Sequence, residues 1–78
     1  MLLIDFLDLL TAEHIVVCEG YGGTLFEGDS AGLAYGIRRG ECNDWIDSDY
    51  GYDIASFTVN SAEVQDDGTV FVFCDTGY

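Results

Sequence analysis

The clearest structural signal in this 78-residue chain is the segment Asp66-Asp67-Gly68-Thr69-Val70-Phe71-Val72-Phe73-Cys74. Asp-Asp-Gly is a strong signal for a tight hairpin turn, because glycine accepts the positive φ that such turns use. The six residues after it have the β-branched and aromatic composition of a strand. Apolar residues occupy both odd and even positions of this strand, which point to opposite faces of a sheet. We therefore expect the strand to lie centrally, with both faces at least partly covered.

The strand that precedes this turn is expected to be irregular. Two strand-like segments, Ile54–Val59 and Ala62–Val64, lie before it. Phe57 and Val59 are at odd positions, whereas the apolar residues of the second segment are at even ones. Because side chains alternate between the faces of a strand, this change of parity predicts a bulge or a break near Asn60-Ser61.

The N-terminal part predicts a helix followed by another hairpin. Over Leu2–Thr11, apolar residues recur at the i, i+3, i+4 and i+7 positions of an amphipathic helix, and the apolar face is wider than one stripe. His14–Glu19 and Thr24–Glu27 are strand-like and flank a glycine-rich turn, Gly20–Gly23. No phosphate-binding glycine motif occurs there, so we interpret the glycines as turn residues.

A second, short helix is expected over residues 31–39. Asp29 or Ser30 can cap its start, and Gly40 suits the stop position after its last turn. Arg38 and Arg39 fall in that last turn, where cations complement the helix dipole.

The predicted order of elements is therefore α-β-β-α-β-β in a single domain over residues 1–78. We expect an α+β fold with two layers, in which the two hairpins join into a four-stranded antiparallel sheet and both helices cover one face. Nearly half of the residues are apolar, so one core can be built despite the short length.

The charge of the chain is strongly one-sided. Fifteen Asp and Glu stand against two Arg and no Lys, which gives a formal charge of −13. Repulsion from phosphates excludes direct nucleic-acid binding and disfavours anionic membranes. A compact chain of this length is about 30 Å across, and the same length of duplex DNA carries roughly 18 charges. The number of carboxylates is thus sufficient to imitate a short duplex.

The densest acidic segment is Glu41–Asp53, where five carboxylates alternate with aromatic and aliphatic residues and no cation occurs. Such a surface suits a basic groove on another protein, although a solvated acidic loop between two structural elements has the same composition. We expect Trp45 to be buried and its neighbouring tyrosines to be exposed. The candidate partner-binding residues are Glu41, Asp44, Asp47, Asp49, Tyr50, Tyr52, Asp53, Asp66 and Asp67.

Residues for catalysis or metal binding are scarce. His14 is the only imidazole, and Cys18, Cys42 and Cys74 lack the spacing of a zinc site. A Cys–His pair of His14 with Cys18 or Cys74 is left open by the spacing. The aspartates of residues 44–53 do not follow the calcium-loop pattern. We therefore expect no enzymatic activity, no catalytic residues, no dedicated metal site and no cofactor.

The N-terminal segment does not read as a targeting signal. It has no basic region, and Asp5 and Asp8 interrupt an apolar run too short to span a bilayer. The three cysteines do not have the number or spacing of a disulfide framework. The simplest expectation is therefore a cytoplasmic protein with reduced thiols, acting in the cytosol of a host cell.

In size, charge and order of elements, this small, acidic, lysine-free chain resembles proteins encoded by phages and mobile elements, and it is similar to anti-CRISPR proteins and other DNA mimics. The resemblance rests on no specific motif. It implies an inhibitor that blocks the DNA channel or the PAM-reading surface of a CRISPR–Cas effector through the carboxylates named above, with Asp29 as a further contact if the fold gathers it.

Two other interpretations fit the composition. A halophile's protein uses an acidic surface for solubility, without any partner. A phage or cytosolic accessory domain could instead act by homo- or hetero-oligomerisation through its wide apolar helix. The sequence leaves open whether the protein is a monomer or a homodimer.

Overall fold

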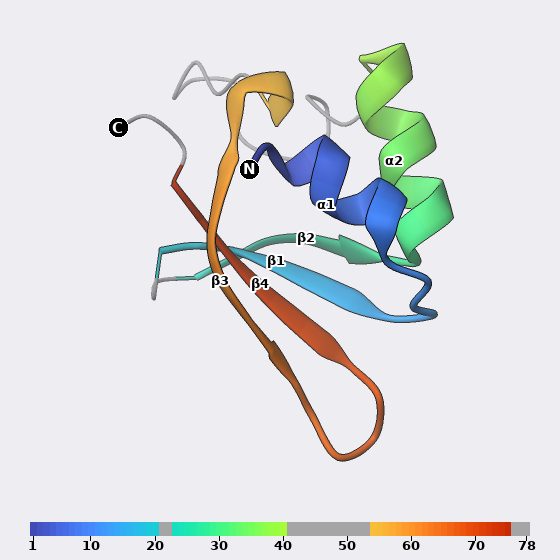
Figure 1. Cartoon of the computed structure of the whole chain (residues 1–78), viewed down its shortest axis with the longest axis vertical. Coiled ribbons are helices and arrows are strands. Elements are labelled where there is room, and N and C mark those ends of the chain that lie inside the picture. The colour runs from blue at the N-terminus through green and yellow to red at the C-terminus, as the bar shows by residue number, and fades with distance from the viewer. Residues whose placement is uncertain (21–22, 41–53, 76–78) are drawn as a thin grey trace.

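The computed structural model of the chain describes residues 1–20, 23–40 and 54–75. Two helices, four strands and one short 3-10 helix follow the predicted α-β-β-α-β-β order, which is confirmed (Figure 1). Their bounds are α1 Leu3–Leu9, β1 Ile15–Glu19, β2 Thr24–Gly28, α2 Ser30–Arg39, η3 Ile54–Ser56, β3 Thr58–Val64 and β4 Val70–Asp75.

The four strands form one sheet in the order β2-β1-β4-β3, with both hairpins antiparallel. The two central strands, β1 and β4, are parallel, with Ile15 opposite Val70 and Val17 opposite Val72. The α+β class is confirmed, but the prediction of a wholly antiparallel sheet was wrong at this pair. The connection from β2 to β3 is long and contains α2 and η3. A connection of this length allows β4 to run either parallel or antiparallel to β1.

Both helices cover the same face of the sheet (Figure 1). Alternate residues of the central strands point into this layer, where they form the core together with side chains from α1, α2 and η3. Its largest fully buried members are Phe57, Leu3, Ile15, Ile54, Val17, Val72 and Cys74. The core therefore lies between the helices and one face of the sheet.

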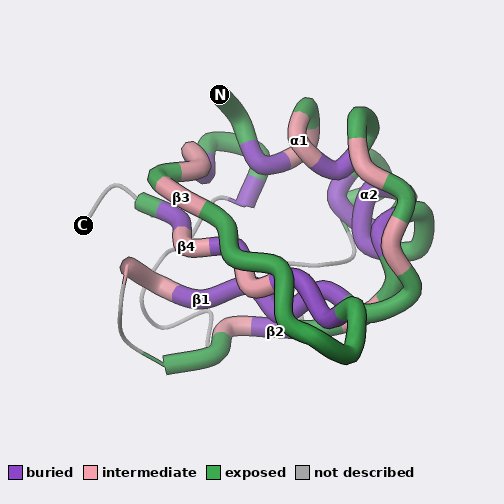
Figure 2. Tube along the Cα trace, turned by 60° about the horizontal axis from the view of Figure 1, so that its bottom comes forward, coloured by how far each residue is buried: buried purple, intermediate pink, exposed green. Residues whose placement is uncertain are grey.

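The two predictions about the C-terminal hairpin are confirmed. β4 is central, and its burial alternates between buried and half-buried residues. The register of β3 shifts between Val59 and Ser61, at the predicted change of parity. Gly68 has a φ of 90° in the turn between the strands, and this hairpin extends beyond the helices, with an exposed turn (Figures 1 and 2).

Two predicted elements differ in the structure. Ile54–Ser56 was expected to be a strand but forms a 3-10 turn, in which the Phe57 amide donates to the Ile54 carbonyl at 3.1 Å. A spacing of three residues brings Ile54 and Phe57 to the same side, so both enter the core. α1 ends at Leu9 rather than Thr11, because Leu10 is already extended.

The second helix ends as predicted and begins at Ser30, one residue earlier than predicted, with Asp29 rather than Ser30 as its cap. The Asp29 carboxylate accepts a hydrogen bond from the Gly32 amide, and Gly40 ends the helix with a φ of 73°. Ser30 is buried, and its hydroxyl accepts from the Ala12 amide at 3.1 Å. The start of α2 is thereby held against the segment that leads into β1. No helix among residues 1–20, 23–40 and 54–75 is long and apolar enough to cross a membrane.

Candidate partner-binding surface

Only two of the nine predicted partner-binding residues lie in the part of the chain that the structure describes. Asp66 and Asp67 are exposed in the turn between β3 and β4. Outside the described residues lie the predicted contacts Glu41, Asp44, Asp47, Asp49, Tyr50, Tyr52 and Asp53, together with Trp45.

The fold gathers carboxylates at one end of the sheet, where β1 and β4 begin and β2 and β3 end. Ten of the fifteen carboxylates are in the described residues, and six of these ten come to this end. We call this region the acidic end; its members are Glu13, Glu27, Asp29, Glu63, Asp66 and Asp67. Asp29 is among them, although its carboxylate also caps α2.

Both arginines of the chain lie away from the acidic end, in the last turn of α2. Arg38 is about 12 Å along the helix axis from Ser30, which begins the helix beside the acidic end. The Arg38 guanidinium donates to the Asp8 carboxylate and lowers the pKa of that carboxyl. Arg39 donates to the Tyr35 hydroxyl and lies 5.3 Å from the centre of its ring. The positive charge of the arginines is thus confined to the helix layer.

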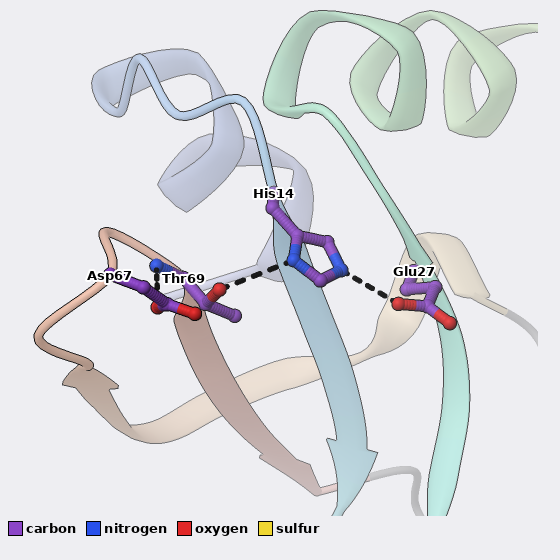
Figure 3. A network of polar contacts seen from close by, with 4 residues as sticks. All are labelled: His14, Glu27, Asp67 and Thr69. Atoms are coloured by element: carbon purple, nitrogen blue, oxygen red, sulfur yellow. Dashed lines mark hydrogen bonds and ion pairs between the residues drawn. The ribbon is translucent and has the colours of Figure 1, made fainter.

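His14 is the one basic side chain among the described residues near the acidic end. Figure 3 shows it between Glu27 and Thr69. Its Nε2 contacts Glu27 Oε2 at 2.7 Å, and its Nδ1 contacts Thr69 Oγ1 at 3.2 Å. Because a carboxylate only accepts hydrogen bonds, Nε2 carries the hydrogen that faces Glu27. The imidazole therefore links β2 to the start of β4 and fixes the orientation of Glu27.

Asp67 is oriented by the same network. One of its oxygens, Oδ1, accepts a hydrogen bond of 2.9 Å from the Thr69 backbone amide (Figure 3). The hydrogen bonds from Thr69, chiefly from that amide, lower the pKa of the Asp67 carboxyl below its ordinary value. Asp67 thus stays ionised and held in one position, which is favourable for binding a cation.

The face of the sheet opposite the helices, which we call the open face, carries a row of four residues across the strands. Val16 is opposite Glu27 on one side and Phe71 on the other, and Phe71 is opposite Glu63. With about 4.8 Å between neighbouring strands, the two glutamates stand roughly 14 Å apart. The row therefore has an apolar centre and a carboxylate at each end.

A hollow lies beside this row, between the β3–β4 turn and the start of β1. We call it the open-face hollow; it is lined by His14, Val16, Thr69, Phe71 and the turn residues 65–67. Phe71 is half-buried, whereas Val16 and Thr69 are buried. The hollow thus has an apolar aromatic floor and an acidic rim.

The structure separates the cysteine and histidine residues that spacing had left as a possible pair. Cys18, in β1, lies four residues after His14, which precedes the strand; this is about 13 Å of extended chain. Cys74 is paired with the far end of β1, and burial, with a smaller effect of Cys18, raises the pKa of its thiol to about 12. Neither thiol is placed for activation by His14. The described residues also contain no group of three or more metal-binding side chains.

Several residues of this surface were not predicted from the sequence. His14, Glu27, Glu63 and Phe71 come together only through the register of the sheet. The sequence held part of this information. Residues 14, 16 and 18 are spaced by two, as are residues 69, 71 and 73, so each set is expected to point to one face of an extended segment. Their common face, however, depends on the parallel pairing of β1 with β4.

Comparison of the chain with protein-family models, curated proteins and solved structures found no significant match.

Proposed function

We propose that this protein is a non-enzymatic inhibitor that binds a basic, nucleic-acid-binding surface of another protein and competes there with nucleic acid. The observation that supports this proposal is the segregation of charge: six carboxylates gather at the acidic end, and both arginines lie on α2. The DNA- or PAM-binding surface of a CRISPR–Cas effector is the first target to test, in line with the resemblance to anti-CRISPR proteins.

The physical basis is replacement of phosphate by carboxylate. A basic groove that binds DNA is held by lysine and arginine contacts and releases counterions on binding. Carboxylates on a rigid sheet end form charge-assisted hydrogen bonds with the same cations. A net charge of −13 also steers the protein towards such a groove, and salt weakens this attraction.

The direct test is a competition assay in which the protein is added to a CRISPR effector before target DNA. We expect DNA binding and cleavage to fall with increasing protein, and the inhibition to weaken as salt is raised. Undiminished DNA binding by every effector type tested, at low as well as moderate salt, contradicts the CRISPR assignment.

Two charge reversals locate the contact surface. Asp66→Lys changes the charge of the acidic end, whereas Asp5→Lys makes the same change in the exposed first turn of α1. We expect Asp66→Lys to weaken inhibition more than Asp5→Lys. Equal effects of the two variants would assign the attraction to net charge alone.

A second candidate function is self-association through the N-terminal segment. Leu9 of α1 is 76% exposed, and Met1 and Leu2 are also exposed, so apolar surface remains outside the core. A dimer whose formation is abolished by Leu9→Glu, seen by light scattering on a sizing column, would support this function. A monomer at all concentrations would exclude it.

A further inference from the structure

We propose that the open-face hollow is the specific anchor site for the partner and that it receives an arginine side chain. This inference rests on the proposed function, because it names the group that the acidic surface recognises on its basic partner. It goes beyond charge attraction, since it requires a defined hollow and a defined side chain.

The floor of the hollow suits a planar cation. Phe71 is half-buried beside the buried Val16, to which it is paired across the parallel strands, so part of its ring is accessible to a ligand. An aromatic ring attracts a cation placed over its face. A guanidinium is flat and weakly hydrated, so it stacks on such a ring at a low desolvation cost.

The rim of the hollow supplies oriented negative charge. Asp66 and Asp67 line it from the β3–β4 turn. Asp67 is held by the Thr69 amide, so little side-chain entropy is lost when it binds a cation. Carboxylates arranged around an aromatic floor match the two properties of arginine, its charge and its flat polar edge.

Lysine fits this hollow less well. Its ammonium is a compact and strongly hydrated charge that cannot lie flat on the Phe71 ring or form paired hydrogen bonds with one carboxylate. A surface that attracts charge alone would treat arginine and lysine alike. A difference in affinity between arginine and lysine therefore tests the site in the hollow, whereas binding of either residue tests the proposed function.

The experiment uses the full chain and two labelled peptides of equal length and charge, one with only arginine cations and one with only lysine. Binding is measured by fluorescence anisotropy at low and moderate salt. We expect the arginine peptide to bind more tightly by roughly two- to fivefold, which corresponds to a cation–π interaction of about 0.5–1 kcal/mol.

Two variants test whether this preference arises in the hollow. Phe71→Leu keeps an apolar floor without the aromatic ring, and Asp67→Asn removes the oriented charge while keeping its shape. Each is expected to bring the arginine-to-lysine ratio towards one, whereas Asp5→Asn, in the helix layer, is expected to leave the ratio unchanged. Asp67→Asn provides the test even if Phe71→Leu does not fold, as judged by circular dichroism.

The outcomes separate the two proposals. Equal, salt-sensitive binding of both peptides overturns the arginine site but supports the acidic binding surface. An arginine preference that persists unchanged in the folded variants also overturns the site in the hollow. Failure of both peptides to bind at low salt overturns the proposed function together with this inference.

Discussion

The two faces of the central strands β1 and β4 differ in composition and in how completely their residues are buried, although these residues alternate along the same stretches of chain. On the helix-covered face, Ile15, Val17 and Val72 are completely buried in the core. On the open face, Val16 and Cys18 are buried, but Phe71 is half-buried and His14, just before β1, is exposed. Carboxylates stand at both ends of the row across this face.

This difference fits a division of roles, in which one face of the strands stabilises the fold and the other is the proposed binding face. The covered face is apolar, and its burial stabilises the fold. The open face combines an aromatic ring with oriented carboxylates, which contribute less to stability and suit a cationic partner. Substitutions on the two faces should therefore have different consequences. The first of four predictions tests that difference directly, and the other three test how the carboxylates contribute to it.

The largest difference is expected between Ile15→Ala and Phe71→Ala. Ile15→Ala leaves a cavity in the core and should lower the free energy of unfolding by about 2–5 kcal/mol. Phe71→Ala should cost about 1–2 kcal/mol, because part of the ring is already exposed. Urea unfolding followed by circular dichroism measures both values. A greater loss for Phe71→Ala would show that the open face is packed as tightly as the core.

The carboxylates of the acidic end should themselves differ in structural importance. Asp29→Ala removes the side-chain cap of α2 and is expected to cost about 1 kcal/mol in the free energy of unfolding. Asp66→Ala, in the exposed turn, should change it by less than about 0.5 kcal/mol. The same unfolding assay compares the two variants. Similar values for both would indicate that the cap contributes little to the folded state.

Neutralisation of a carboxylate should have opposite consequences in the two layers at low salt. Asp8→Asn removes the partner of Arg38 and is expected to lower the Tm. Asp66→Asn removes one charge from a region without arginine or lysine, so relief of repulsion should keep the Tm equal or raise it. Moderate salt should reduce both changes. A fall in Tm for Asp66→Asn at low salt would contradict the expected repulsion at the acidic end.

The smallest expected effect is the pH dependence of Asp67. Since the pKa of its carboxyl is lower in the folded than in the unfolded chain, its ionisation stabilises the fold above the ordinary value of 3.8. This stabilisation is lost as the pH falls through the folded pKa. The wild type should therefore be more stable than Asp67→Asn near neutral pH, and the difference should shrink in acid. Unfolding at moderate salt across this pH range measures it, and a difference that is independent of pH would contradict the role of the Thr69 hydrogen bond.

The elements that local sequence determines were predicted well. The Asp66-Asp67-Gly68 turn, the bulge near Asn60 and the cap and stop of α2 depend on residues within a few positions of one another. The error at Ile54–Ser56 has a physical cause, because an apolar spacing of three residues suits a 3-10 turn that delivers two side chains to the core. Its composition alone does not distinguish such a turn from a short strand.

The candidate site was predicted only in part. Asp66 and Asp67 were identified from their charge, but His14, Glu27 and Phe71 were not assigned to the surface. Glu27 lies on β2, Phe71 on β4 and His14 immediately before β1, and their meeting requires the register between β1, β2 and β4. The predicted contacts of residues 41–53 remain predictions, as does the resemblance to anti-CRISPR proteins.

The acidic excess, the order of helices and strands and the local turns can be predicted from the amino-acid sequence, because composition and short-range patterns carry that information. The parallel pairing of β1 with β4 is seen only in the folded chain. The same holds for the gathering of six carboxylates at one end of the sheet, away from the arginines of the helix layer. The physical reason is that the pairing of distant strands depends on how the whole apolar core closes, which no local pattern specifies.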